Sequence, residues 1–348
     1  MIIKLLDASE GSNYDDFVER HRAGMFFYTR AYQSLIAEQL NAESFCLVAY
    51  DNERMIGTFP LMLSRVGKFG RIANSLPFFN SNGGVLINCE GANYTEDFVS
   101  SKLIDAAMNL MIKKECSALT VVSNPLCASQ AGLLELGFGF SHTDSRISLI
   151  TALPQYDPDI ENMLIKKFSE PRPRNIRKAK KSGVSIEKHT SHEALKFLYD
   201  VHADNMNAIG APAKDRSFFE NIPKHIDTDS FSVFVASIDG VKAAGLLLFY
   251  GSKTVEYFTP GTIHEFRNMQ PSALLILHAM IDASMMGYQY WNWGGTSASQ
   301  IGVYDFKKKW GSDESKYHFY TKVFNEGLLE VPPETLQSEY PNFYVRPY

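Results

Sequence analysis

Apolar and polar positions follow the same succession of patterns in the two halves of the chain. Residues 45–57 and residues 233–245 each read as an apolar run, a polar turn and a second apolar run, and Asp51 aligns with Asp239. Apolar runs joined by Asp-Asn or Asp-Gly predict a β-hairpin, because these residues tolerate the left-handed backbone of a tight turn. We therefore predict one hairpin in each half.

The segments that follow each hairpin also recur in a constant order. A β-rich run comes first, then a segment of helical periodicity, a short strand, and a glycine beside an aromatic residue. In the first half these lie at 70–75, 95–114, 118–123 and Gly137, and in the second at 254–259, 271–286, 288–293 and Gly311. Each match alone is common, but the ordered set indicates an internal duplication. We predict an α/β fold of two tandem modules, each a mixed sheet flanked by helices.

The 348 residues suffice for two hydrophobic cores, at roughly 100–200 residues per domain. A polar stretch with two prolines, residues 153–158, predicts the junction between them. We predict a first domain at 1–153, a second at 154–330 and a tail at 331–348. The prolines of the tail indicate irregular chain packed on the surface.

Composition narrows the class of protein. A net charge of −5 argues against a general coating of nucleic acid but permits one local basic site. No apolar run approaches the roughly 20 residues of a membrane span, and the first ten residues do not read as a signal peptide, so we expect a cytoplasmic protein. The four cysteines lie in or beside apolar runs, which predicts buried reduced thiols, and no metal site is expected from the nine histidines.

The strongest charge feature is the segment 166–188, which holds nine basic residues against two acidic ones. Residues 174–181 have a helical pattern that Gly183 would end. Four of the basic residues are candidate ligands for phosphates on a nucleotide, a pyrophosphate carrier or a tRNA backbone: Arg174, Arg177, Lys178 and Lys181. An ordinary solvated basic helix is the alternative.

Two further segments combine a strand end with a turn. Residues 257–277 run from a strand through a loop to a helix start near Pro271, where free backbone N–H groups suit an anion. Residues 290–311 hold all three tryptophans beside a Gly-Gly pair that permits close approach of a ligand. A plain connection and aromatic core packing are the respective alternatives. Nucleophile elbows, Walker loops, dinucleotide fingerprints and His-Glu-x-x-His motifs are absent from the sequence.

Three stretches of the second half resemble the Fem-type branch of the GNAT acyltransferase superfamily, which includes aminoacyl-tRNA-dependent peptidoglycan-bridge transferases. Residues 174–184 resemble its Arg-x-x-Ile-Arg-Lys-Ala-x-x-x-Gly-Val signature, and 199–212 resemble its following helix and Gly-x-Pro turn. Residues 271–311 resemble its long helix, last core strand, Gly-Gly loop and Phe-Lys element. The first half matches more loosely, at 26–32 and 75–84. The resemblance implies two GNAT-like domains, with substrates bound mainly by the second.

Candidate roles follow from that resemblance. We expect Lys307, in the Phe-Lys element, to be a cation near the developing charge or the leaving oxygen, with Tyr257 and Tyr304 handling protons. Leu133 stands where the first half would carry a lysine, so we expect the first domain to be non-catalytic. The expected substrate-binding residues are Arg174, Arg177, Lys178, Lys181, Asn205, Gln270, Trp293, Gly294 and Gly295.

The expected donor is a co-substrate and not a tightly bound cofactor. GNAT enzymes that use coenzyme A usually carry a glycine-bearing pyrophosphate loop before the long helix, and residues 266–273 lack those glycines. This favours aminoacyl-tRNA or another carrier-bound donor. We expect an N-acyltransferase that moves an acyl or aminoacyl group onto an amine, in cell-envelope or polysaccharide metabolism. The alternatives are an acyl-CoA- or acyl-carrier-dependent N-acetyltransferase and a non-catalytic ligand-binding GNAT pair; the oligomeric state stays open.

Overall fold

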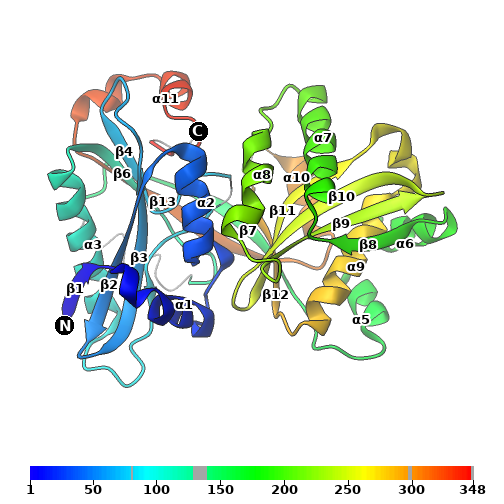
Figure 1. Ribbon diagram of the computed structural model, residues 1–348, viewed down its shortest axis with the longest axis horizontal. Helices are drawn as coiled ribbons and strands as arrows, with labels where there is room; N and C mark the ends of the chain where they lie inside the picture. Colours follow the sequence, from blue (N-terminus) through cyan, green and yellow to red (C-terminus); the bar gives the residue numbers. More distant parts are fainter. Residues whose placement is uncertain (80, 128–138, 297–299, 346–348) are drawn as a thin grey trace. The chain divides into compact units, whose positions relative to one another are not determined.

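The chain forms two compact units in a computed structural model that describes residues 1–79, 81–127, 139–296 and 300–345 (Figure 1). Unit 1 contains Met1–Ile147 together with Ser315–Tyr348, and unit 2 contains Ser148–Glu314. Each unit is a sheet with helices on both faces. Leu133 and Gly137, which the repeat aligns with residues of the second half, lie outside the described residues.

Unit 1 is built on a mixed sheet. Its strands, in spatial order, are β1 (Ile2–Leu5), β2 (Glu43–Asp51), β3 (Arg54–Leu63), β4 (Arg71–Asn74), β6 (Cys116–Val122) and β13 (Asp313–Val323), with β5 (Leu86–Ile87) beside β3. Neighbouring strands are antiparallel except β4 and β6, which are parallel. Helix α3 (Glu96–Lys113) lies on one side of the sheet, and α1 (Gly11–Arg20) and α2 (Arg30–Leu40) lie on the other (Figure 1).

Helix α3 shows why these residues form this layer. Thr95 caps the helix by accepting a hydrogen bond from the backbone N–H of Phe98, which satisfies one otherwise free donor. Its apolar side chains at positions 99, 103, 107 and 111 recur every fourth residue, so they share one face. That face is buried against β2, β3 and β6 in the main core of the unit.

Unit 2 repeats the strand order of unit 1. Its strands are β8 (Ser185–His189), β9 (Phe231–Ile238), β10 (Val241–Tyr250), β11 (Thr254–Thr262), β12 (Tyr290–Thr296) and β7 (His142–Ala152). The parallel pair is β11 and β12, the counterpart of β4 and β6. Helices α7 (His192–Ala208) and α8 (Arg216–His225) cover one face (Figure 1). Helices α5 (Ile160–Lys167), α6 (Arg172–Lys181) and α9 (Pro271–Met285) cover the other, and α10 (Ile301–Lys308) follows β12.

The two units confirm the predicted fold class and the predicted hairpins. β2 and β3 pair up to Asp51 and Arg54, and β9 and β10 pair up to Ile238 and Val241. The turn residue Asn52 has a φ of 53°, and Asp239 and Gly240 have φ of 50° and 78°. These left-handed conformations explain why Asn, Asp and Gly occupy the turns.

The last strand of unit 1 comes from the far end of the chain. β13 pairs with β6 through Phe319 and Val122, among other residues, so residues 315–330 lie in unit 1. The predicted bounds assign these residues to the second domain. A pairing between strands almost 200 positions apart leaves no local pattern in the sequence, because strand signals show where a strand is and not which strand it joins.

The C-terminal tail is more regular than predicted. Residues after β13 include a helix, α11 (Pro333–Glu339), which corrects the expectation of irregular chain. Leu336, Tyr340 and Phe343 are buried. The backbone N–H of Tyr344 donates to Asn74 Oδ1 at 2.7 Å, which ties the tail to β4.

The burial of the cysteines and the lengths of the helices can be compared with what the sequence predicts. All four cysteines are free; Cys46, Cys116 and Cys127 are buried, as expected, and Cys89 is half-buried. Burial raises the pKa of the Cys46 thiol to about 11 and that of Cys116 to about 12, which makes these thiols poor nucleophiles. Within the described ranges, no helix is both long and apolar enough to cross a membrane.

Candidate active site

Lys307 lies near the end of α10, and its side chain is buried, with a residue exposure of 6%. Its ammonium Nζ donates to the carbonyl oxygens of Gly294, at 3.2 Å, and Gly295, at 2.9 Å. The third partner is Thr296 Oγ1, at 3.0 Å. All three acceptors are neutral, and removal from water lowers the pKa of Lys307 to about 8. The two following lysines are only half-buried, so Lys307 is the one of the three that points inward.

The Gly-Gly pair at the end of β12 forms the other side of this contact. Gly294 has a φ of 72°, a left-handed conformation that strains any residue with a Cβ. Asn292 Oδ1 accepts a hydrogen bond from the Gly294 N–H at 2.9 Å and holds this turn. The turn exposes two successive carbonyl groups to Lys307, which gives the glycines predicted as binding residues a defined local role.

Tyr257 on β11 packs against the tryptophans of β12. Its ring centroid lies 4.8 Å from that of Trp293 and 6.1 Å from that of Trp291. Trp293 is buried, and its Nε1 donates to Thr151 Oγ1 at 2.9 Å. Loss of water raises the pKa of the Tyr257 hydroxyl well above its usual value. This hydroxyl has no hydrogen-bond partner in the described part of the chain.

Arg172, which the sequence did not single out, contacts the segment that carries Lys307. It is the first residue of α6, and its guanidinium carbon lies 4.3 Å from the ring centroid of Phe306 and 5.4 Å from that of Trp310. Nη2 donates to the Phe306 carbonyl at 3.2 Å. Burial lowers its pKa, and none of the described carboxylates forms an ion pair with it. The contact joins positions 134 apart. The sequence therefore shows that residue 172 is basic, but not that it contacts Phe306.

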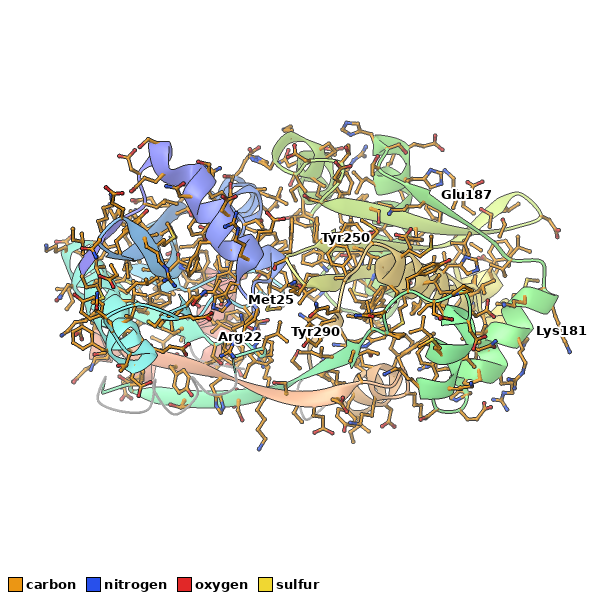
Figure 2. The ribbon with its side chains drawn as sticks, turned by 90° about the horizontal axis from the view of Figure 1, so that it is seen from below. Arg22, Met25, Lys181, Glu187, Tyr250 and Tyr290 are labelled. Atoms are coloured by element: carbon orange, nitrogen blue, oxygen red, sulfur yellow. The ribbon has the colours of Figure 1, made fainter. Side chains whose placement is uncertain are left out.

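The predicted basic face of α6 is exposed to solvent. Arg174, Arg177, Lys178 and Lys181 all point to solvent, whereas Ile176 and Ala179 form the buried face. Arg177 lies 3.8 Å from the exposed Glu170. Lys181 is nine positions beyond Arg172, or roughly 14 Å along the helix axis. Figure 2 shows Lys181 and Tyr290, the first residue of β12, toward opposite ends of unit 2.

The other predicted site residues are engaged in local contacts. Tyr304 donates its hydroxyl to Glu314 Oε1 at 2.5 Å, and this contact raises its pKa. Asn205 donates to the Thr262 carbonyl at 2.9 Å and accepts from the Thr262 N–H at 3.0 Å, which fixes α7 to β11. Gln270 has a φ of 60° at the start of α9 and donates to the Arg267 carbonyl at 2.9 Å. Their contacts with a substrate stay predictions.

Comparison with known proteins finds one family match, and the matched segment contains several of these residues. Residues 172–308 match the family described as acetyltransferase (GNAT) domain, and this segment contains Arg172, Tyr257, Gly294 and Lys307. The chain has a Fem-like tandem GNAT fold. A search of curated proteins finds no match to the sequence.

Solved structures show the same fold over nearly the whole chain. FemX is similar with a TM-score of 0.76 and 15% identity, over 95% of this chain and 99% of FemX. A tandem GNAT protein from the clavulanic acid biosynthesis pathway has a TM-score of 0.54 and 14% identity, over 92% and 98%. A conserved protein from Bacteroides thetaiotaomicron has a TM-score of 0.54 and 11% identity, over 92% and 100%. At these identities the likeness concerns the fold alone, and function has to be argued from the site.

The GNAT-matching segment brings together part of the predicted site. Lys307, Gly294 and Gly295 are in direct contact, and Tyr257 and Trp293 form an adjoining aromatic group. Among the described residues, the Lys307 ammonium is buried without a counter-ion, and the Tyr257 hydroxyl has no hydrogen-bond partner. Such groups can stabilise an oxyanion and donate a hydrogen bond, which are the needs of acyl transfer.

Proposed function

We propose that the protein is an N-acyltransferase that moves an activated acyl or aminoacyl group onto an amine, with Lys307 at the reacting centre. The observation that carries the proposal is the Lys307 ammonium, held by three neutral acceptors. A buried cation that no described carboxylate neutralises presents its charge to a developing oxyanion at low dielectric, where that charge is worth most. The match of residues 172–308 to the GNAT acetyltransferase domain supports acyl transfer as the reaction class.

In the proposed reaction an acceptor amine attacks the carbonyl carbon of an ester or thioester, and the tetrahedral intermediate carries an oxyanion. When the intermediate collapses, the ester or thioester bond breaks, the amide forms, and one proton of the attacking amine passes to the departing oxygen or sulfur. Lys307 stabilises the oxyanion or this leaving group. Tyr257 donates a hydrogen bond from its free hydroxyl to the same intermediate. The remaining contribution is orientation of the two substrates, which supplies a large part of the rate in reactions of this kind.

We further propose that the donor is aminoacyl-tRNA or a comparable carrier, used in the cytoplasm for cell-envelope or polysaccharide synthesis. The segment before α9 supports this, because it is a 3₁₀ helix, η4 (His264–Met269), that is followed by Gln270 and has no glycines to wrap a pyrophosphate. The exposed basic face of α6 also suits a long polyanion, which can contact a surface remote from its reacting end.

The experiment supplies the purified protein with radiolabelled aminoacyl-tRNAs or acetyl-CoA, each with a panel of amine acceptors. We expect transfer of label from charged tRNA in the wild type and a loss of at least about 100-fold in Lys307→Ala. Full turnover in a folded Lys307→Ala protein would exclude the proposed role of Lys307 and assign catalysis to other groups. No turnover of the wild type with any of the donors would favour a non-catalytic binding function. Transfer from acetyl-CoA alone would keep the reaction class and replace the donor.

The second candidate is an N-acetyltransferase that uses acyl-CoA or an acyl carrier. The name of the matching family, acetyltransferase (GNAT) domain, favours it. Calorimetry with acetyl-CoA, in the presence and absence of an acceptor, separates the two candidates. A donor that the enzyme uses must bind under at least one of these conditions.

A further inference from the structure

A buried series of hydrogen bonds leads from β11 to the carbonyl group that holds Lys307. Glu256 on β11 and Asn292 on β12 face each other in the parallel ladder, and they are 1% and 2% exposed. Asn292 Nδ2 donates to Glu256 Oε2 at 2.6 Å. The other carboxyl oxygen, Oε1, accepts from Thr254 Oγ1 at 2.7 Å. Both oxygens of the carboxyl group are therefore bonded, and its direction is fixed.

The carbonyl end of Asn292 continues the series along its own strand. Oδ1 accepts from the Gly294 N–H at 2.9 Å and from Ser148 Oγ at 3.2 Å. The carbonyl oxygen of Gly294 in turn accepts from Lys307 Nζ at 3.2 Å. The path from carboxylate to ammonium thus runs through one side-chain amide and one left-handed glycine.

The placement of a carboxyl group here calls for a reason beyond stability. Burying a carboxylate is costly even when it is hydrogen-bonded, and an apolar pair at the same ladder position would avoid that cost. The neighbouring ladder residues, Val255 and Trp291, are apolar and fully buried. The hydrogen-bonded path from Glu256 to Lys307 runs through Asn292 and Gly294, so a change at Glu256 can alter the geometry of both.

We propose that Asn292 and Glu256 are positioning residues for Lys307: they hold the turn at Gly294, whose carbonyl group binds the ammonium, and so fix the place of its charge in the site. The proposal rests on the proposed role of Lys307 and names two residues that act through it. Neither touches the reacting atoms, so their loss lowers kcat and leaves KM within about twofold.

The test exchanges the amide and the carboxylate between the two strands. N292D keeps the shape of the side chain and the acceptor for Gly294, but it replaces the amide donor by a second carboxyl group. Two carboxyl groups at the 2.6 Å separation of the present hydrogen bond share one proton at neutral pH and repel each other once both ionise. We expect kcat to fall at least about tenfold, with a loss that grows as the pH rises and the second carboxyl group ionises. The double variant N292D/E256Q restores one amide and one carboxylate in reversed order, and we expect it to recover most of that loss.

One single variant tests Glu256, and a second serves as the control. E256Q keeps an acceptor for Asn292 and offers its new amide to the Thr254 hydroxyl, so we expect a smaller fall in kcat than in N292D. S148A removes only the 3.2 Å bond to Asn292 Oδ1 and leaves the path to Lys307 complete. N292A breaks the path without adding a buried charge, and it replaces N292D should that variant not fold.

The second readout does not depend on turnover. The titration of Lys307 is followed by NMR of the full-length protein with ¹³Cε-labelled lysine, and the signal is assigned by its absence in Lys307→Arg. We expect the titration midpoint of Lys307 to move by at least about half a unit in N292D or N292A and to return in N292D/E256Q. A folded N292D or N292A with wild-type kcat and wild-type Lys307 titration overturns the proposal. A displaced titration with unchanged turnover keeps the positioning and removes the catalytic role of Lys307.

Discussion

The guanidinium of Arg172 lies 4.3 Å from the ring centroid of Phe306, the residue directly before Lys307. Its Nη2 also donates to the Phe306 carbonyl near the end of α10, where unpaired carbonyl groups favour a cation. Arg172 therefore connects the start of α6 to the helix that carries Lys307, and this connection gives the first prediction.

Arg172→Lys is expected to destabilise the protein by about 1–2 kcal/mol and to lower kcat, because a point charge cannot replace a planar group stacked on Phe306. Urea unfolding and kcat measure the two effects. Arg174→Lys, two positions along on the exposed face, is the matched control and should change neither quantity. Equal stability of both variants would show that the stacking contributes nothing.

The stability of the protein should rise with pH because of Lys307. Its pKa is about 8 in the folded state and 10.5 ordinarily, so between these values the unfolded chain binds more protons. The cost of burying the ammonium, about 3 kcal/mol, is complete below pH 8 and vanishes as the pH approaches 10.5. Urea unfolding of Lys307→Met should therefore show a weaker rise with pH than the wild type across this window. Parallel pH profiles would mean that Lys307 is not desolvated.

The activity should have the opposite pH dependence. If the protonated form of Lys307 stabilises the oxyanion, kcat falls as the pH rises through about 8. Lys307→Arg keeps its charge at every accessible pH, so its lower activity should no longer fall in this range. An unchanged alkaline limb in Lys307→Arg would assign that limb to another group.

Gly294→Ala and Gly287→Ala form a matched pair. Both glycines are left-handed, with φ of 72° and 86°, so each substitution should cost roughly 1 kcal/mol of stability. Gly287 has open space around its missing Cβ, whereas Gly294 holds Lys307 through its carbonyl group. Only Gly294→Ala should lose activity as well. Similar activity in both variants would separate the Gly294 turn from catalysis.

The basic face of α6 can be tested by charge reversal. Lys178→Glu combined with Lys181→Glu should weaken tRNA binding and lower the slope of log K against log salt by about two. The control reverses Lys102 and Lys113, which are exposed on α3 and change the net charge equally. Filter binding over a range of salt concentrations measures the affinity for tRNA and its salt dependence in each double variant. The same slope in both double variants would remove α6 from the tRNA surface.

Local patterns predicted the elements of this fold well. The Asp239-Gly240 turn, the helix after Thr95 and the basic helix that ends before Gly183 all follow from residues within a few positions of one another. The predicted catalytic lysine was chosen among three adjacent ones by resemblance, and burial separates it from its neighbours. The basic face of α6 was predicted as a surface, and its four predicted residues are exposed.

The sequence alone determined the duplicated strand-helix order, the hairpins and the positions of the glycines, because backbone conformation and periodicity depend on near neighbours. Only the tertiary structure decided that β13 pairs with β6, that Arg172 stacks on Phe306 and that Glu256 reaches Lys307 through Asn292 and Gly294. These contacts join positions far apart in the chain, and their energies depend on burial and direction, which no local pattern records.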